Sequence, residues 1–430
     1  KTPATGETVY YIASSTKPFT GLMAAVLDSR GVLSLNSTLG SHLGDTQMPD
    51  SIDASVIRMR DLLSHTAGFE NGPITGRLAY TGDHDPETLW ALLAHSSLNS
   101  EAPYGTFQYD NLGYNVYTMV QDRVTGRAWQ DMLEETVLSP LGMEHTSAYA
   151  SKPRARGLTL AAPYFGLHPD GPQRVYLEKR DNTMQSAGGI MTTPRDLGRW
   201  LAFQLNEGRL QGKQVIPADV VRSTWARLAE VENTRPPFGS EAYGLGWNHG
   251  SYQSERVLHH AGGFAGFRSL ISFMPDAKVG VAVLVNDSGM GTFLTGVVSA
   301  WAYDWWLRTE SPDFVPSPES LAGMRDQYQQ QMRDEFEKRA ARKWMLARDY
   351  GAYAGTYYSD LWGTFVVEHE GGALRVRAGN LHCTATAYEK PETARLELVP
   401  GSGIVMRFEP ETGPVERVVV DGDVYERVGK

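Results

Sequence analysis

The sequence predicts an α+β protein in two parts, in which a larger mixed region precedes a small antiparallel β-barrel domain. Three patterns indicate this: an amphipathic helix near the N-terminus, a β-hairpin late in the larger region, and period-two alternation toward the C-terminus. The chain has 430 residues, enough for more than one domain. We expect a first domain over residues 1–308, a linker and connecting helix over 309–348, and the barrel over 349–430.

The first expected element is a strand that leads into a helix. The stretch "TVYYIA" (8–13) alternates like a strand and precedes an apolar helix face. That face consists of Phe19, Leu22, Met23, Val26 and Leu27. Ser14 therefore lies at a strand-to-helix turn, where a serine can cap free N–H groups. Lys17 lies one turn further on, close to the Ser14 hydroxyl.

The sequence next predicts the end of a helix and, later, a β-hairpin. Glu134 to Leu138 lead into "PLGM", where Pro140 and Gly142 mark the end of a helix. The stretch "RSLISFM-PDAK-VGVAVLV" (268–285) predicts two antiparallel strands joined by a tight turn. Its second half, "VGVAVLV" (279–285), is too short to cross a bilayer and indicates a buried strand.

The texture of the chain changes after this hairpin. Three prolines in residues 309–320 mark a linker, and the charged pattern over about 319–348 predicts a solvated connecting helix. From Tyr350 onward, runs such as "GTFVVEHEGGALRVRAG" alternate between glycine-bearing turns. This pattern is typical of a small antiparallel barrel or sandwich.

Composition excludes several functions. A net charge of −10 argues against a nucleic-acid partner. The single cysteine, Cys383, excludes an intrachain disulfide and a cysteine metal cluster. The eleven histidines show no HExxH spacing, so we expect no metal and no other cofactor. No G-x-S-x-G is present, which argues against an α/β-hydrolase nucleophile.

The Ser14–Lys17 pair gains meaning only from partners, because about 0.7 such pairs arise by chance in a chain of ordinary composition. "FQYDNLGY" supplies Tyr109 and Asn111. "VLHHAGGFAGF" supplies the triplet His260, Ala261 and Gly262, followed by Gly263.

Taken in this order, the three motifs resemble those of the serine β-lactamase and penicillin-binding protein superfamily: SxxK, Tyr-x-Asn, and Lys/His-x-Gly on a sheet-edge strand. The resemblance is closest to the class C-like branch, with family VIII carboxylesterases, D-aminopeptidases and DD-peptidases. Supporting stretches are 59–69, 140–147, 186–200 and 243–247. The resemblance implies a β-lactamase-like α/β sandwich, an antiparallel sheet flanked by helices, with a helical subdomain.

The resemblance also implies roles. Ser14 would attack an acyl carbon and form an acyl-enzyme, with Lys17 and Tyr109 as general base and acid in an order that the sequence leaves open. Tyr109 could act as the base only if a charge such as that of Lys17 lowered its pKa. Asn111 would hold Lys17 and contact the substrate, and the Gly263 N–H would join the Ser14 N–H in an oxyanion hole.

Each residue taken singly has a structural alternative. Tyr109 could be an ordinary core aromatic, and Asn111 could be a turn former. Gly262 and Gly263 could be present only because the backbone there leaves no room for a side chain. Only their joint occurrence favours catalysis. We interpret His65 in "LSHTAGF" as structural.

His260 narrows the substrate. Many relatives have a lysine there, whose charge grips a substrate carboxylate, whereas a histidine is mostly neutral near pH 7. This favours ester or peptide hydrolysis of a small or peptide-like acyl donor. Two other enzymatic interpretations remain open: a peptidase for D-residue or cell-wall peptides, and a weak β-lactamase. A non-catalytic peptidoglycan-binding or assembly protein also remains open. We expect a periplasmic or secreted location.

Two departures from the family pattern stand out. Pro18 biases Lys17 away from helical geometry. Only thirteen residues precede Ser14, whereas the family places a helix and the first strands of its sheet there. We therefore expect an N-terminal segment to be missing from this sequence or supplied as a separate chain, since the sheet would otherwise expose an edge.

The C-terminal stretch 353–376 resembles the lipocalin-like barrel found on many of these hydrolases. In that family the barrel often caps the active-site cleft or mediates assembly, so a homo-oligomer is an open expectation. A role in folding or solubility alone is an equally good interpretation.

Overall fold

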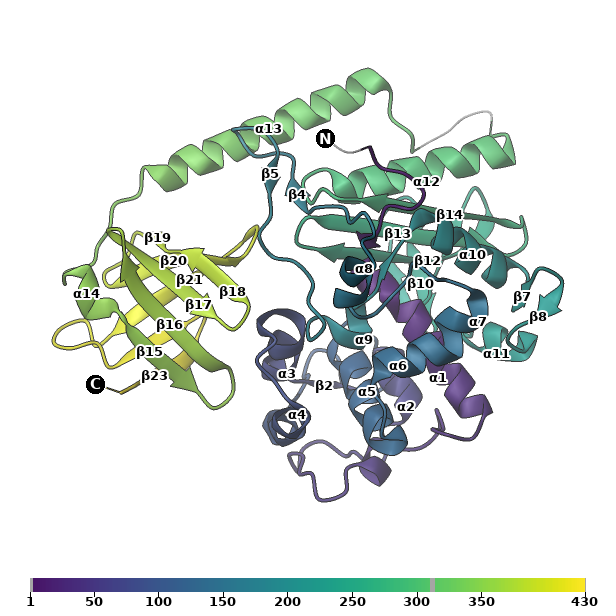
Figure 1. Ribbon diagram of the computed structural model, residues 1–430, viewed down its shortest axis with the longest axis horizontal. Coiled ribbons are helices and arrows are strands. Elements are labelled where there is room, and N and C mark those ends of the chain that lie inside the picture. Colours follow the sequence, from purple (N-terminus) through teal and green to yellow (C-terminus); the bar gives the residue numbers. More distant parts are fainter. Residues whose placement is uncertain (1–2, 310–313, 430) are drawn as a thin grey trace.

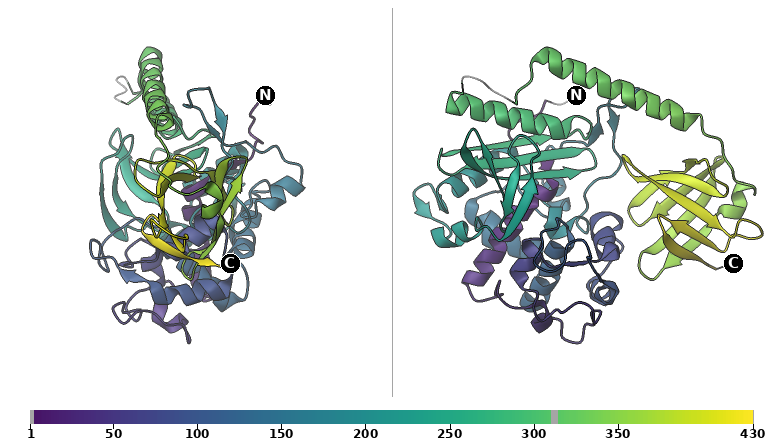
Figure 2. Two further views of the ribbon diagram at one scale, coloured as in Figure 1. Left: turned by 90° about the vertical axis from the view of Figure 1, so that its left-hand side faces the viewer. Right: turned by 180° about the vertical axis from the view of Figure 1, so that it is seen from behind.

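A computed structural model describes residues 3–309 and 314–429 (Figure 1). A central antiparallel sheet has helices on both faces, and a separate sheet forms the C-terminal part (Figures 1 and 2). The long helix α13 (Pro318–Ala340) runs from the central sheet's side of the molecule to the C-terminal sheet. The predicted α+β class with a C-terminal antiparallel barrel is confirmed.

The central sheet has six strands in the order β14-β13-β12-β11-β10-β9. They are β9 (Ala229–Asn233), β10 (Ser240–Tyr243), β11 (Asn248–Tyr252), β12 (Glu255–Phe264), β13 (Phe267–Met274) and β14 (Val279–Val285). All neighbours are antiparallel, and β13 pairs with β14 from Arg268–Val285 to Met274–Val279. The predicted hairpin is therefore confirmed.

The second strand of this hairpin corrects one expectation. β14 is only half-buried along its whole length, although its sequence predicts a buried strand. It lies at the edge of the sheet and has no second neighbour among residues 3–309 and 314–429. Sequence carries the apolar character of a strand but not its place in the sheet.

The strand that carries the His260 triplet corrects another expectation. β12 is the third strand of the sheet and not an edge strand. However, β11 pairs with β12 only between Glu255 and His259, whereas β13 continues along it to Phe264. The half of β12 that begins at His260 is therefore unpaired by β11, and this local edge faces the turn that carries Ser14.

The N-terminal segment forms the predicted strand-to-helix turn, and this turn lies beside the unpaired half of β12. β1 (Tyr10–Tyr11) pairs with β6 (Met191–Thr192), the 3-10 turn η1 (Ala13–Thr16) follows, and helix α1 (Lys17–Ser29) begins directly after it. Ala13 has a φ of 47°, a left-handed conformation that is strained for a residue with a side chain. The strain lies at the residue before Ser14.

Pro18 does not displace Lys17 from helical geometry. Lys17 has φ −54° and ψ −41°, and Pro18 falls in the first turn of α1, where its missing N–H needs no partner. The bias away from helical geometry that a proline imposes on the preceding residue is therefore overcome at Lys17. The predicted apolar face of α1 is buried, and Phe19 stacks on Trp200 with ring centroids 3.9 Å apart.

Helices cover both faces of the sheet and form the helical subdomain. They are α2 (Met59–Leu63), α3 (Gly72–Gly76), π-helical η3 (Arg77–Thr81), α4 (Pro86–Leu92), α5 (Leu112–Thr125), α6 (Trp129–Leu133), η5 (Glu134–Leu138), α7 (Ser139–Leu141), α8 (Ser151–Ala155), α9 (Gln185–Gly188), α10 (Pro194–Leu205), α11 (Ala218–Ser223) and α12 (Gly291–Leu307). Short 3-10 turns are η2 (Leu39–His42) and η4 (Leu93–His95). Gly142, with φ 63°, ends α7 where "PLGM" predicts a helix end.

Three small two-stranded ladders complete this region. They are β2 (Phe69–Glu70) with β3 (Ser97–Leu98), β4 (Tyr164–Phe165) with β5 (Gln173–Arg174), and β7 (Arg209–Leu210) with β8 (Lys213–Gln214). Within the described residues, no helix combines the length and apolar character that crossing a bilayer requires.

The connecting helix is solvated as predicted, since α13 buries none of its residues. It ends at Ala340, short of the predicted 348, and the predicted linker falls partly on residues 310–313, outside the described residues. After the short helix α14 (Tyr350–Tyr353), a nearly closed nine-stranded antiparallel sheet follows. Its strands are β15 (Gly355–Ser359), β16 (Gly363–Glu370), β17 (Ala373–Ala378), β18 (Leu381–Thr384), β19 (Thr386–Ala387), β20 (Thr393–Val399), β21 (Ser402–Glu409), β22 (Arg417–Val420) and β23 (Asp423–Val428).

Candidate active site

Ser14 and Lys17 meet at the junction of η1 and α1. The Lys17 Nζ atom lies 3.4 Å from Ser14 Oγ. Nζ also donates to Asn111 Oδ1 at 2.8 Å and to the Ala187 carbonyl oxygen at 2.9 Å. The amine is thus held by three oxygen acceptors from three separate segments, and it points at the hydroxyl of Ser14.

The surroundings of Lys17 favour its neutral form. Its side chain is 0% exposed, and its acceptors are all uncharged oxygens. Burial lowers its pKa to about 7, and the charge of Asp110 opposes this shift. An amine with that pKa is a competent proton acceptor near neutral pH.

Tyr109 lies over the same amine, with the Lys17 Nζ atom 4.8 Å from its ring centroid. Although 42% of Tyr109 is exposed, desolvation raises its pKa above the ordinary value, and a hydrogen bond with Ser14 opposes the rise. The lowering that a tyrosine base would need does not occur. Tyr109 therefore stays protonated near neutral pH and can donate.

Asp110 and His65 fix the loop that carries Tyr109 and Asn111. Asp110 accepts the Gly113 N–H at 2.8 Å and so caps the start of α5, and its own N–H donates to His65 Nδ1 at 3.3 Å. Burial raises the Asp110 pKa to about 6, whereas burial lowers the His65 pKa well below its ordinary value. The predicted structural role of His65 fits this geometry.

His260 lies behind Tyr109, with ring centroids 6.1 Å apart, and is 2% exposed. Its Nδ1 lies 2.7 Å from the Ala261 carbonyl oxygen, to which it must donate, and Nε2 accepts from the Tyr243 hydroxyl at 3.1 Å. Burial lowers the His260 pKa to about 3, with Lys17 adding to the shift. His260 is therefore neutral, and both ring nitrogens are engaged within the protein.

Two glycines are required by close approaches at the site. A Cβ on Gly262 would collide with the Ile12 carbonyl oxygen and lie 3.0 Å from the Ser15 N atom. Gly246 has φ 89°, and a Cβ there would lie 2.6 Å from the Lys17 carbonyl carbon. β12 thus passes directly beside the η1 turn, and Gly263 follows on the same strand.

Ser15 ties this turn to the sheet. Its hydroxyl donates to the His260 carbonyl oxygen at 3.0 Å and lies 2.8 Å from Ser269 Oγ. Ser269 in turn donates to the Ile12 carbonyl oxygen at 2.7 Å. The two hydroxyls, both buried, clamp the turn before Ser14 between β12 and β13.

The structure brings the residues expected from the sequence into one place: Ser14, Lys17, Tyr109, Asn111, His260, Gly262 and Gly263. Sequence reasoning missed the Ala187 carbonyl and Tyr243. Both lie in stretches that resemble the family, 186–200 and 243–247. The resemblance pointed to these stretches but not to the contacts that Ala187 makes with Lys17 and Tyr243 makes with His260. A backbone carbonyl has no side-chain signature.

Cavities flank the site on two sides. One of about 500 Å³ is lined by His65, Gln108, Tyr109 and Asp110, among others. Another of about 790 Å³ reaches Ala261 of β12 and is lined mostly by apolar residues such as Phe238, Phe293 and Phe314. The described residues contain no group of three or more His, Cys, Asp or Glu side chains placed to hold a metal ion.

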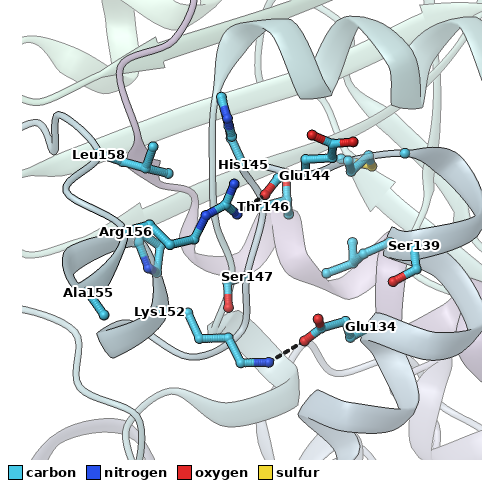
Figure 3. Close-up of a pocket in the computed structure, with 14 residues that line it drawn as sticks. Glu134, Ser139, Glu144, His145, Thr146, Ser147, Lys152, Ala155, Arg156 and Leu158 are labelled. Atoms are coloured by element: carbon cyan, nitrogen blue, oxygen red, sulfur yellow. Dashed lines mark hydrogen bonds and ion pairs between the residues drawn. The ribbon is translucent and has the colours of Figure 1, made fainter.

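A further cavity of about 590 Å³ lies apart from this chemistry (Figure 3). All its lining residues fall between Glu134 and Leu158, and the ion pair of Lys152 with Glu134 spans one side of it. Both partners of that pair are almost half exposed, so it contributes little stability. None of the site residues expected from the sequence lines this cavity.

Comparison with known proteins adds family relationships to this geometry. The profile of the Beta-lactamase family matches residues 1–297. An unguisins hydrolase of Aspergillus campestris is 26% identical over 297 residues, 67% of this chain and 54% of that protein. Protein flp of Staphylococcus aureus is 28% identical over 295 residues, 66% and 54% of the respective chains. The chain thus spans about half the length of these curated relatives.

Solved structures show the same fold. The octameric penicillin-binding protein homologue from Pyrococcus abyssi superposes with a TM-score of 0.61 at 19% identity, covering 98% of this chain and 89% of that one. D-amino acid amidase from Ochrobactrum anthropi SV3 gives 0.57 at 21% identity, covering 72% and 85%. At these identities the likeness concerns the fold.

Proposed function

The chain belongs to the beta-lactamase family, in the serine β-lactamase and penicillin-binding protein superfamily, and from this premise we propose that it is a serine hydrolase with Ser14 as nucleophile. The Ser14 Oγ–H bond breaks as Oγ bonds to the acyl carbon, and the proton passes to Lys17 Nζ. The N–H groups of Ser14 and Gly263 receive the oxyanion. Collapse breaks the bond to the leaving group, which takes a proton either directly from Lys17 or from Tyr109. In the second case Lys17 then returns its proton to Tyr109, so that Lys17 is neutral again before deacylation.

Deacylation repeats the sequence with water as the nucleophile. Water gives a proton to Lys17 as its oxygen bonds to the acyl carbon, and the Ser14 Oγ–C bond then breaks as Oγ regains a proton. Asn111 keeps the amine in place through both steps. No cofactor takes part in the proposed cycle.

One observation carries the proposal: a buried lysine amine with a pKa of about 7 lies 3.4 Å from a serine hydroxyl. The buried Lys179 also has a pKa of about 7, so what distinguishes Lys17 is the serine hydroxyl within reach of its amine. The raised pKa of Tyr109 favours Lys17 as the base and Tyr109 as the proton donor.

The neutral His260 supports an ester or peptide substrate without an obligatory carboxylate beside the scissile bond. Its two nitrogens are already bonded to Ala261 and Tyr243, so it offers no cation for such a group. The second candidate is an amide of a D-residue, because one similar structure is a D-amino acid amidase. β-Lactam hydrolysis is expected to be weak.

Labelling and turnover test the proposal. A fluorophosphonate probe should modify Ser14, and Ser14→Ala should abolish both labelling and hydrolysis. A panel of p-nitrophenyl esters, D-aminoacyl amides and nitrocefin then ranks the substrate classes. An unlabelled, inactive wild-type protein that still binds peptidoglycan fragments would favour the non-catalytic alternative, and nitrocefin turnover as fast as ester turnover would overturn the substrate assignment.

We also propose that the C-terminal sheet is a lipocalin-like domain and that the chain forms a homo-oligomer. The penicillin-binding protein homologue from Pyrococcus abyssi, whose structure matches nearly the whole chain, is octameric. Light scattering coupled to size-exclusion chromatography measures the mass directly. A monomer at micromolar concentration would contradict the second part of this proposal.

A further inference from the structure

The C-terminal barrel touches the catalytic domain through the turn between β15 and β16. At this turn, Arg77 of η3 donates from Nε to the Leu361 carbonyl at 2.8 Å and from Nη2 to the Asp360 carbonyl at 3.1 Å. Its Nη1 donates to the Asp83 carbonyl at 2.9 Å. Arg77 is only 4% exposed, so a buried guanidinium is held by three carbonyl oxygens, two of them from the barrel.

The same turn is wedged against α3. A Cβ on Gly76 would collide with the Trp362 ring, and a Cβ on Gly72 would lie 3.4 Å from it. The ring thus packs directly on the backbone of the helix that precedes η3. Figures 1 and 2 show α3 on the side of the catalytic domain that faces the barrel.

From η3 the contacts continue to the active site. The Leu78 carbonyl, one residue after Arg77, accepts the Met184 N–H at 2.6 Å. Met184 and Gln185 have φ values of 61° and 32°, an unfavourable backbone that needs outside support. Gln185 is the first residue of α9, and the Ala187 carbonyl of this helix accepts a hydrogen bond from Lys17 Nζ at 2.9 Å.

A second set of bonds joins the same segments. The Asn182 side chain donates to the Gly82 carbonyl at 2.8 Å, and the Asn380 N–H of the barrel donates to the Thr81 carbonyl at 2.8 Å. The end of η3 is therefore bonded on one side to the barrel and on the other to the segment that begins α9. The strained turn at Met184 is supported through η3.

We propose that Arg77, held by the barrel turn 360–362, is a positioning residue for the catalytic Lys17, acting through η3 and the Met184–Gly188 segment. This rests on the proposed function, in which Lys17 is the base. The barrel turn is then part of the active-site scaffold, because α9 supplies Ala187, one of the two acceptors besides Ser14 that hold the amine in place. Substrate does not touch Arg77.

Arg77→Ala tests this in the full-length protein. The variant should lower kcat for a p-nitrophenyl ester, and the rate of Ser14 labelling, by about 10- to 100-fold, since small displacements of a catalytic group have effects of this size. KM should change less than about twofold, because no binding contact is removed. Millimolar guanidinium ion should restore much of the lost labelling rate by occupying the vacated space.

Two matched variants separate positioning from general effects. Arg123→Ala removes an arginine that also donates to carbonyls, those of His42 and Leu43, but is remote from the barrel. Tyr176→Phe removes a different interdomain contact, in which the hydroxyl bonds to the Leu398 carbonyl. Both should keep wild-type kcat. A loss in Tyr176→Phe equal to that in Arg77→Ala would overturn the proposal, as would wild-type kcat in Arg77→Ala.

A second route covers an Arg77→Ala variant that does not fold. Trp362→Ala leaves Arg77 intact and removes a ring that packs on α3 and on the cluster that includes the barrel core, and it should lower kcat by about three- to tenfold with little change in KM. Insolubility of both variants would also overturn the proposal, because the turn would then be needed for folding and not for aiming Lys17. A wild-type protein that is not labelled at Ser14 defeats the proposed function itself, before any variant is compared.

Discussion

Both regions of the chain bury a basic side chain, but the two side chains have opposite surroundings. In the barrel, Arg348 forms an ion pair with Glu392, whose side chain is 3% exposed and also accepts from the Tyr353 hydroxyl at 2.8 Å. In the beta-lactamase-family domain, Lys17 has no exposed surface, whereas 13% of the Arg348 side chain is exposed, and Lys17 has only uncharged acceptors among the described residues. The ion pair of Arg348 stabilises the local structure. The Lys17 amine has no oppositely charged partner at hydrogen-bond distance, and its pKa of about 7 allows it to exchange protons at neutral pH.

The largest expected effect comes from making the charge of Lys17 permanent. Lys17→Arg should lower kcat/KM for an ester by about 10³-fold or more, because a guanidinium is always protonated and cannot accept the serine proton. Steady-state kinetics on a p-nitrophenyl ester measure this. Activity within about tenfold of wild type would contradict Lys17 as the base.

The corresponding change in the barrel should affect stability and not turnover. Glu392→Gln removes the negative charge beside Arg348 and should cost about 1–3 kcal/mol in the free energy of unfolding, since the guanidinium keeps its bonds to the Pro410 and Gly413 carbonyls. Denaturant unfolding followed by circular dichroism of the full chain measures the loss, and ester turnover at 20 °C serves as the control. A fall in kcat comparable to that of Lys17→Arg would erase the contrast between the two regions.

The pH dependence should follow the unpaired amine. Lys17 must be neutral to act, and its pKa is about 7, so kcat/KM should fall about tenfold per pH unit below that value and level off above it. His65 and His260 face Lys17 but have pKa values already lowered by burial, so they do not supply this limb. A pH–rate profile that stays flat down to pH 5 would contradict the assignment.

Asp110 offers a variant that moves this limb in a known direction. Its charge raises the Lys17 pKa, so Asp110→Asn should shift the acid limb of kcat/KM to lower pH. Because Asp110 itself has a pKa of about 6, its protonation below that pH lowers the Lys17 pKa, so the wild-type limb should become shallower there. The same pH–rate measurement serves, and a shift to higher pH would show that Asp110 does not act on Lys17 in this way.

The smallest effect concerns the neutral neighbour of the site. Tyr243→Phe removes the donor to His260 Nε2 and leaves a buried acceptor unpaired, which should cost about 1–3 kcal/mol in stability. Because His260 contributes no charge, kcat should fall no more than about threefold. A loss above about 100-fold would mean that this tyrosine takes part in proton transfer.

The sequence predicts well what depends on neighbouring residues. The strand-to-helix turn at Ser14, the hairpin 268–285 and the barrel strands follow from local periodicity and turn residues, and each is present. Pro18 is a local signal that misleads, because its effect depends on where the helix starts. With the helix beginning at Lys17, the proline falls in the first turn.

What the sequence does not predict depends on segments far apart in the chain. β14 is half-buried because it lies at the edge of the sheet. The sequence of a single strand does not show its position among the other strands. The engagement of His260 depends on Tyr243 of another strand, and the third acceptor of Lys17 is a main-chain carbonyl. The family resemblance supplies the residues of the site but not the contacts that tune them.

The clamp formed by Ser15 and Ser269 also has a consequence for the folding of the site. Ser15 bonds to His260, 245 residues later, and Ser269 bonds to Ile12, 257 residues earlier. The two contacts cannot both form before the chain has been synthesised as far as Ser269, and closing so long a loop costs conformational entropy. A nascent chain that has not reached this point lacks the clamp on the turn that carries Ser14.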